Sequence, residues 1–194
     1  MPTGNNIYMK KHMKTLVIHP EDHTTDFLKP IYASLPDTTV VMGGVGRKEI
    51  HALIEGHERI LMMGHGSSTG LFSMGRYGVR YFEKIVDHES VPYLRGKENI
   101  FIWCYASDFV KTHDLKGFST GMFISEVSEA RICNVSQYDQ QMVDESNACF
   151  VDVVARHIEE PLPVLYDMTR REYSAHAKGN LISLYNTERL FCAA

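Results

Sequence analysis

The sequence predicts an α/β fold in which helices cover both faces of a mostly parallel sheet. Short apolar runs rich in β-branched residues alternate with helical stretches along most of the 194 residues, which is typical of strand–helix–strand units. The run NIFIWC at 99–104 is almost entirely apolar, as expected for a strand that is buried on both faces. These observations together predict a three-layer α/β/α sandwich.

The first half of the chain predicts the order β-α-β-α-β. The first helical stretch opens with a Thr suited to helix capping and is predicted as a helix although it contains Pro30. The expected strands are 14–20, 38–44 and 59–66, and the expected helices are 24–35 and 46–57.

The second half is more mixed. The run at 99–104 predicts the fourth strand, and 141–160 predicts the strongest helix because its apolar residues recur near one face. The tail from 161 is harder to assign. The remaining expectations are a Gly-rich hairpin at 68–78, a mostly polar helical region at 79–95, and strands, or one bent strand, at 121–127 and 130–136.

Composition limits the classes of function. The formal net charge is −4 and no long basic run occurs, which disfavours nucleic-acid binding. No apolar stretch is long enough to span a membrane, and the N-terminus lacks the apolar core of a signal peptide, so a cytoplasmic protein is expected. The four dispersed cysteines predict reduced thiols. We expect a disordered extension at 1–12 and one domain over 13–194.

Two predicted strand ends place a histidine and a cysteine at the same edge of the sheet. The third strand ends at His65-Gly66, and the fourth ends at Cys104. If these strands are neighbours, the two side chains lie together, because the carboxyl ends of parallel strands meet at one edge. A thiol within reach of an imidazole suffices for covalent acyl transfer. The backbone N–H groups of Gly66 and Cys104 are placed to stabilise an oxyanion, and Gly66 also lets a substrate approach the backbone.

The same residues also fit structural roles. A cysteine at a strand end is often an inert part of the core, so the pattern alone leaves Cys104 open between nucleophile and buried thiol. GHGSSTG at 64–70 is also a loop of the kind that holds phosphate, although it lacks the lysine of GxxxxGK[ST]. HPEDH at 19–23, together with His65, offers metal ligands, although such a stretch at a turn is more often a polar loop.

Three blocks resemble, in order, the caspase-like cysteine peptidases, the group of caspases, metacaspases, clostripain-like enzymes, gingipains and separases. RILMMGHGSSTGLFSM is similar to their apolar strand, His-Gly and hairpin. PYLRGKENIFIWCYAS is similar to the helix, basic turn and strand that lead to the nucleophile, and FSTGMFISEVSEA to the segment that follows it. The resemblance covers roughly 14–136 and implies a caspase-like topology, His65 as general base, Cys104 as nucleophile, and no cofactor.

The chain departs from the caspases proper, because Trp103 precedes the cysteine where caspases carry Gln-Ala, and Tyr-Ala-Ser follows it. An acidic pocket would favour Arg or Lys before the scissile bond, whereas solvated loop carboxylates would have no such effect. Arg76 and Arg80 follow the hairpin and would suit an acidic residue instead. The carboxylates that are candidates for the acidic pocket are Asp22, Asp108, Glu126 and Glu129.

The prediction from sequence is therefore a cysteine endopeptidase that acts through a Cys104–His65 dyad on a polypeptide substrate. The rival prediction is a catalytically inactive caspase-fold module that regulates or binds a partner, and the unusual Trp103 motivates it. A nucleotide- or metal-dependent hydrolase on a Rossmann-like sheet is a more distant alternative. Whether the domain forms a homodimer stays open.

Overall fold

The structure is a computed structural model that describes residues 13–73 and 83–194. The expected extension at 1–12 and the segment that contains Arg76 and Arg80 lie outside these residues. The disorder of the extension and the role of the two arginines therefore stay predictions.

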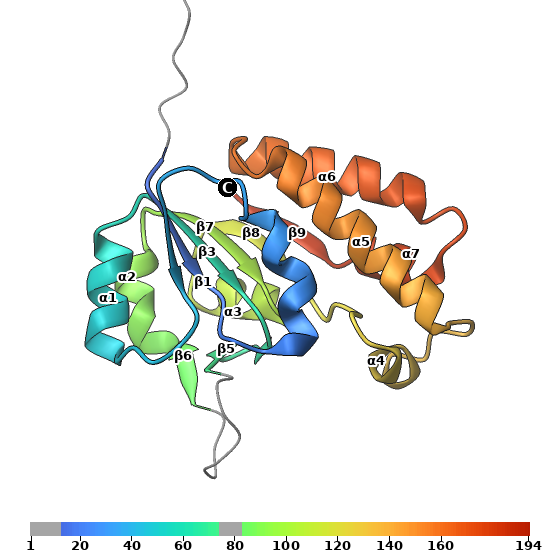
Figure 1. The fold of residues 1–194 in the computed structure, drawn as a ribbon, viewed down its shortest axis with the longest axis horizontal. Coiled ribbons are helices and arrows are strands. Elements are labelled where there is room, and N and C mark those ends of the chain that lie inside the picture. The colour runs from blue at the N-terminus through green and yellow to red at the C-terminus, as the bar shows by residue number, and fades with distance from the viewer. Residues whose placement is uncertain (1–12, 74–82) are drawn as a thin grey trace, which may run out of the picture.

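A six-stranded sheet forms the centre of the fold (Figure 1). Its strands lie in the order β2-β1-β3-β7-β8-β9. All neighbouring pairs are parallel except β8 and β9, which are antiparallel. The sheet is therefore mostly parallel, as predicted, with an antiparallel strand at one edge. The strands are β1 Thr15–Ile18, β2 Thr38–Val41, β3 Arg59–Met63, β7 Glu98–Ile102, β8 Gly117–Thr120 and β9 Leu190–Ala193.

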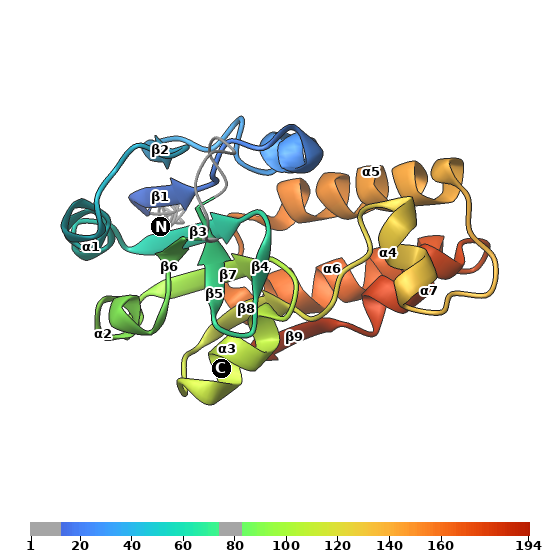
Figure 2. The same cartoon turned by 90° about the horizontal axis from the view of Figure 1, so that it is seen from below.

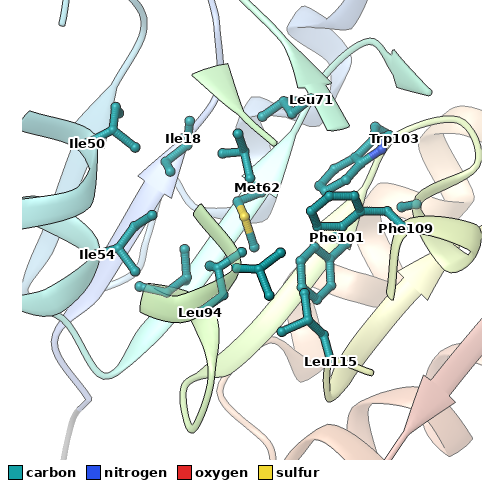
Figure 3. Close-up of a cluster of buried hydrophobic side chains, with 14 of the residues drawn as sticks. Ile18, Ile50, Ile54, Met62, Leu71, Leu94, Phe101, Trp103, Phe109 and Leu115 are labelled. Atoms are coloured by element: carbon teal, nitrogen blue, oxygen red, sulfur yellow. The ribbon is translucent and has the colours of Figure 1, made fainter. Parts of the chain in front are cut away.

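Alternate residues of the central strands are buried on opposite faces of the sheet. On one face, residues such as Met62 and Phe101 pack against α1 (Arg47–Glu55), α2 (Val91–Leu94) and α3 (Ala106–Thr112), as Figure 3 shows. The neighbouring residues Leu61 and Ile100 are buried on the other face. Because both faces are covered, the strands are apolar at nearly every position.

The second face is covered by the 3-10 helix η1 (His23–Ile31) and by α5 (Gln140–His157) and α6 (Leu162–His176). The long helix predicted at 141–160 is confirmed. The tail adds α7 (Leu181–Thr187) and β9. In the described part of the chain, no helix is long and apolar enough to cross a membrane.

The first predicted helix, 24–35, is a 3-10 helix rather than an α-helix. Asp22 caps it, with its side chain accepting the N–H of Thr24 at 2.9 Å. Pro30 lies inside it, and proline has no N–H to donate to the carbonyl four residues earlier and clashes with it. The α-helical hydrogen-bond pattern is therefore unavailable in this segment.

The strands predicted at 121–127 and 130–136 are wrong. The fifth parallel strand is β8, which ends at Thr120, and 127–132 instead form the helix α4 (Val127–Ile132). Glu126 and Glu129 form a capping box at its start. Two carboxylates three residues apart satisfy the free N–H groups of the first helical turn, and this local signal outweighs the β-branched residues nearby.

A small antiparallel sheet follows β3 (Figure 2). Its strands are β4 Gly66–Ser67, β5 Gly70–Phe72 and β6 Lys84–Val86. The structure has a hairpin at 66–72, where β4 and β5 pair, so the hairpin begins two residues before the predicted range 68–78. The end of that range lies outside the described residues. Of the helical region predicted at 79–95, the structure describes only 83–95. There the prediction is wrong for β6 and correct for the end, where the 3-10 turn η2 (His88–Ser90) and α2 lie.

Candidate active site

The carboxyl ends of four parallel strands surround a cavity of about 30 Å³, which has room for about two water molecules. β2 lies on one side of β1 and β3 lies on the other, so the strand order reverses between β1 and β3. Ligands bind at such points in open α/β sheets. The lining residues are Thr25, Phe27, Leu28, Gly64, His65, Ile102, Trp103, Cys104, Thr120, Phe123 and Ser125.

His65 and Cys104 follow two adjacent strands at matching positions. The parallel register of β3 and β7 runs from Arg59↔Glu98 to Met63↔Ile102, and His65 and Cys104 each lie two residues beyond the last pair. Both residues line the cavity. The structure thus brings together the histidine and cysteine that the sequence predicts as a pair.

Gly64 turns the chain out of β3 just before His65. Its φ is +136°, a conformation that residues with a Cβ rarely adopt, and its N–H donates to the carbonyl of Ile102 at 3.1 Å. The strand predicted to reach 66 therefore ends at Met63. His65 follows the turn and is 29% exposed.

Gly66 is required for a reason that the sequence pattern does not show. A Cβ there would lie 2.2 Å from Cδ1 of Trp103 and 2.8 Å from the carbonyl oxygen of Gly70. The indole N–H of Trp103 donates to the carbonyl of Ser67 at 3.0 Å. Trp103 therefore fastens the hairpin after His65 to the strand that carries Cys104. The single tryptophan beside the candidate nucleophile was the available signal.

Cys104 lies in a tight strand-to-helix turn. Tyr105, the next residue, has a φ of +65°, and its N–H donates to the carbonyl of Gly121 at 3.0 Å. The hydroxyl of Thr120 donates to the carbonyl of Trp103 at 2.8 Å. Left-handed backbone at a non-glycine residue persists only where the surroundings enforce it, so β8 fixes the turn that presents Cys104.

The thiol of Cys104 points toward the segment after β8. It donates to the carbonyl of Phe123 at 3.6 Å. Burial, with a smaller contribution from the negative charge of Glu129, raises the pKa of Cys104 to about 12. The thiol is therefore protonated at neutral pH in this structure.

His65 contacts the turn after β1. Its Nε2 lies 2.7 Å from Oγ1 of Thr24 and 3.8 Å from Oδ2 of Asp22. Burial raises the pKa of Asp22, but the hydrogen bonds from Thr24 and the nearby histidines outweigh it, so the net pKa is lowered. Asp22, predicted to line an acidic pocket, thus lies beside His65 instead of among the cavity residues.

The other three predicted carboxylates also lie outside the set of cavity-lining residues. Asp108 is exposed on α3. Glu126 caps α4, and Oε2 of Glu129 accepts the N–H groups of Ser125 and Glu126 at 2.8 and 3.0 Å. Glu129 is the one whose charge acts on Cys104 and whose partner, Ser125, lines the cavity.

The two amides predicted to share an oxyanion belong to Gly66 and Cys104. The N–H of Phe72 donates to the carbonyl of His65, and hydrogen-bonded pairs alternate along an antiparallel ladder. The pair Gly66↔Leu71 is therefore a non-hydrogen-bonded one, which leaves the Gly66 amide outside the ladder. Within 13–73 and 83–194, the Cys104 amide donates to no backbone carbonyl.

The histidine at the end of β1, His19, is 2% exposed and supports the turn beside the site. Its Nδ1 lies 3.0 Å from the hydroxyl of Tyr32, and its Nε2 lies 3.1 Å from Oγ1 of Thr25. Burial and the positive charge of Lys29 lower the pKa of His19 to about 4. It is therefore neutral at physiological pH.

We expect His19 to make the stability of the protein pH-dependent. The unfolded chain takes up the His19 proton near the ordinary pKa of about 6.5, whereas the folded chain does so only near 4. The contribution is complete above about pH 6.5 and is lost as the pH falls toward 4. Between pH 7 and 5 the loss is about 2 kcal/mol of unfolding free energy, measurable by urea denaturation.

His19→Gln serves as the control for this prediction, because glutamine does not titrate. The variant should lose about 2 kcal/mol less than the wild-type chain between these pH values. An equal loss in both proteins would show that other groups cause the pH dependence.

The arrangement has the components for acyl transfer by a thiol. Among the described residues, no group of three or more His, Cys, Asp or Glu is placed to hold a metal ion. A scan against protein-family models and a search of the curated proteins gave no match. The assignment of a function therefore depends on the geometry of this site.

Proposed function

We propose that the protein is a cysteine endopeptidase of caspase-like topology, with Cys104 as nucleophile and His65 as general base. The observation that carries the proposal is the register of β3 and β7, which places His65 and Cys104 at matching ends of adjacent central strands, around one cavity. The hairpin after His65 and the helix α2 before β7 occur in the order that the sequence resemblance implies.

The chemistry begins when the thiol turns from Phe123 toward His65. His65 takes the proton from Sγ, which forms a bond to the substrate carbonyl carbon as the carbonyl oxygen becomes an oxyanion. The C–N bond then breaks, and His65 gives the proton to the departing amine. Water next attacks the thioester, with His65 taking its proton and returning it to the sulfur of Cys104. The amides of Gly66 and Cys104 stabilise the oxyanion in both steps.

The preference for Arg or Lys before the scissile bond depends on Glu129. It is the predicted carboxylate that acts electrostatically on Cys104 and supports the cavity residue Ser125. A cationic side chain that enters beside Ser125 would approach this carboxylate. Opposite charges attract most strongly where water is excluded, which supports a basic substrate residue at this position.

A catalytically inactive binding module is the second candidate, and the state of Cys104 favours it. A pKa of about 12 leaves almost no thiolate at neutral pH. The cavity of about 30 Å³ is also too small for a substrate side chain as it stands. The peptidase proposal therefore requires that a bound peptide opens the site and brings the thiol to His65.

Chemical labelling separates the two candidates. Iodoacetamide carries no peptide and therefore reports on the thiol alone. Because the Cys104 thiol is protonated, we expect iodoacetamide to modify Cys104 about a hundredfold more slowly than it modifies the thiol of glutathione at about pH 8. Peptidyl chloromethyl ketones that end in lysine or alanine place a peptide in the site. For each thiol, the rate with the peptidyl reagent is divided by the rate with iodoacetamide. We expect this ratio to be at least about tenfold larger for Cys104 than for glutathione.

The control is His65→Ala, in which the gain from the peptidyl reagents should disappear. A faster reaction with the lysine reagent than with the alanine reagent supports the basic preference. If the ratio of the two rates is no larger for Cys104 than for glutathione, the peptidase proposal is wrong and the binding module is supported. Mass spectrometry locates the modified cysteine in each case.

A further inference from the structure

We propose that Thr24 and Asp22 are positioning residues that hold His65 in the tautomer with hydrogen on Nε2, so that Nδ1 is the nitrogen that accepts the thiol proton. This inference depends on the proposed peptidase function, and it adds two members to a site for which the sequence resemblance implies only a dyad.

The hydrogen-bond donors around Thr24 determine the tautomer. Oγ1 of Thr24 lies 2.8 Å from Oδ1 of Asp22 and 2.7 Å from Nε2 of His65. An ionised carboxylate can only accept, and a hydroxyl has one hydrogen to donate. The hydroxyl hydrogen therefore points to Asp22, and Nε2 of His65 must carry the hydrogen that it donates to Oγ1. The lone pair of His65 is then on Nδ1.

Asp22 is held firmly as the acceptor at the end of this chain. Its Oδ1 accepts the N–H of Thr24 at 2.9 Å as well as the hydroxyl, and its side chain is 10% exposed. These hydrogen bonds lower the pKa of Asp22 despite its burial. Asp22 is therefore ionised at neutral pH, which is the state that the assignment of the tautomer requires.

A second layer of hydrogen bonds fixes the turn itself. The hydroxyl of Thr25 donates to the backbone carbonyl of Asp22 at 3.1 Å, and the buried His19 contacts the same hydroxyl at 3.1 Å. The Thr25 hydroxyl has one hydrogen, which it donates to Asp22, so Nε2 of His19 must donate to this hydroxyl. Because His19 is neutral, its Nδ1 then accepts from the hydroxyl of Tyr32. The orientation of Thr24 and Asp22 is thus set by the fold rather than by a substrate.

The two residues contribute to catalysis through His65. When His65 takes the thiol proton it becomes positive, with the carboxylate of Asp22 3.8 Å from Nε2. A nearby negative charge stabilises the imidazolium, and a fixed tautomer keeps the basic nitrogen on the reacting side. Removing the hydroxyl leaves both tautomers accessible, so we expect a loss of roughly 10- to 100-fold in kcat with KM changed less than about threefold.

Thr24→Val tests the proposal, because valine has nearly the shape of threonine and keeps the backbone N–H that caps onto Asp22. Thr24→Ser restores the hydroxyl and should restore kcat to within about threefold of the wild-type value. Asp22→Asn keeps a side-chain oxygen for the cap but removes the charge, and we expect kcat to fall as in Thr24→Val. The substrate is the peptide that the wild-type protein cleaves fastest.

The tautomer is measured directly by nitrogen-15 NMR of histidine-labelled protein at about pH 8, where ordinary histidines are neutral. His65→Gln identifies the His65 signals. We expect hydrogen on Nε2 alone in the wild-type and Thr24→Ser proteins, and a mixture of both tautomers in Thr24→Val. This readout needs no substrate, and the spectra also show whether each variant is folded.

The outcomes separate this inference from the peptidase proposal. If the wild-type His65 carries its hydrogen on Nδ1, or if Thr24→Val changes neither tautomer nor kcat, the positioning role is wrong. If the tautomer depends on Thr24 but the wild-type protein cleaves no peptide, the contact is supported and the peptidase proposal fails. A kcat that falls in Thr24→Val and recovers in Thr24→Ser supports both.

Discussion

Cys104→Ala is expected to reduce peptide hydrolysis by at least about a thousandfold. The sulfur is the atom that attacks the substrate carbonyl in the proposed mechanism, and a positioned nucleophile cannot be replaced by its neighbours. The fold should tolerate the change, since alanine keeps the Cβ and the thiol that is lost makes one weak hydrogen bond, to Phe123. We expect the unfolding free energy to change by less than about 1 kcal/mol.

The measurements are the rate of cleavage of a peptide library and urea denaturation of both proteins. Cys149→Ala is a matched control, because Cys149 is another partly buried free thiol and lies on α5, outside the cavity. It should retain full activity. Combining Cys104→Ala with His65→Ala should cost no more than the single change, since the two residues act as a unit. Undiminished cleavage by Cys104→Ala would exclude it as the nucleophile.

Gly66→Ala is expected to destabilise the protein by about 1–4 kcal/mol. The new Cβ would overlap the Trp103 ring, which is 2% exposed and cannot move outward. Overpacking of this kind costs about 1–3 kcal/mol, and displacing the indole breaks its hydrogen bond to Ser67, worth about 1 kcal/mol. Alanine restricts the unfolded chain and recovers less than about 1 kcal/mol, so the clash dominates.

Gly179→Ala is the comparison, because a Cβ at Gly179 meets nothing within 4 Å and its backbone is not left-handed. It should be neutral or slightly stabilising, by up to about 1 kcal/mol. Both free energies of unfolding come from urea denaturation. Equal stability of the two variants would mean that the hairpin shifts freely, and Trp103 would then not fasten it.

The sequence predicts the central sheet and the His65–Cys104 pair because both depend on simple patterns. Apolar runs mark strands that are buried on both faces, and parallel strands bring their carboxyl ends to one edge. The segment after β8 is harder, because β-branched residues there compete with the capping signal of Glu126 and Glu129. Local propensity alone does not decide between these two signals.

The contacts that complete the site join residues distant in sequence and therefore leave no local pattern. Thr24 meets His65 across 41 positions, and the indole of Trp103 meets Ser67 across 36. The sequence pattern predicts Asp22 at the correct edge of the sheet, but the partner of its side chain depends on how the turn after β1 is folded. Side-chain orientation is a property of packing, which a single sequence does not display.

Trp103 is also a built-in optical reporter, since the chain has one tryptophan and it lies directly under the hairpin beside Cys104 (Figure 3). Its ring packs edge-on against Phe101, with centroids 5.4 Å apart. Fluorescence excited at the red edge of indole absorption therefore arises from the wall of the cavity and from nowhere else in the molecule. Binding of a peptide, movement of the hairpin and unfolding can each be followed in unlabelled protein through this one emission.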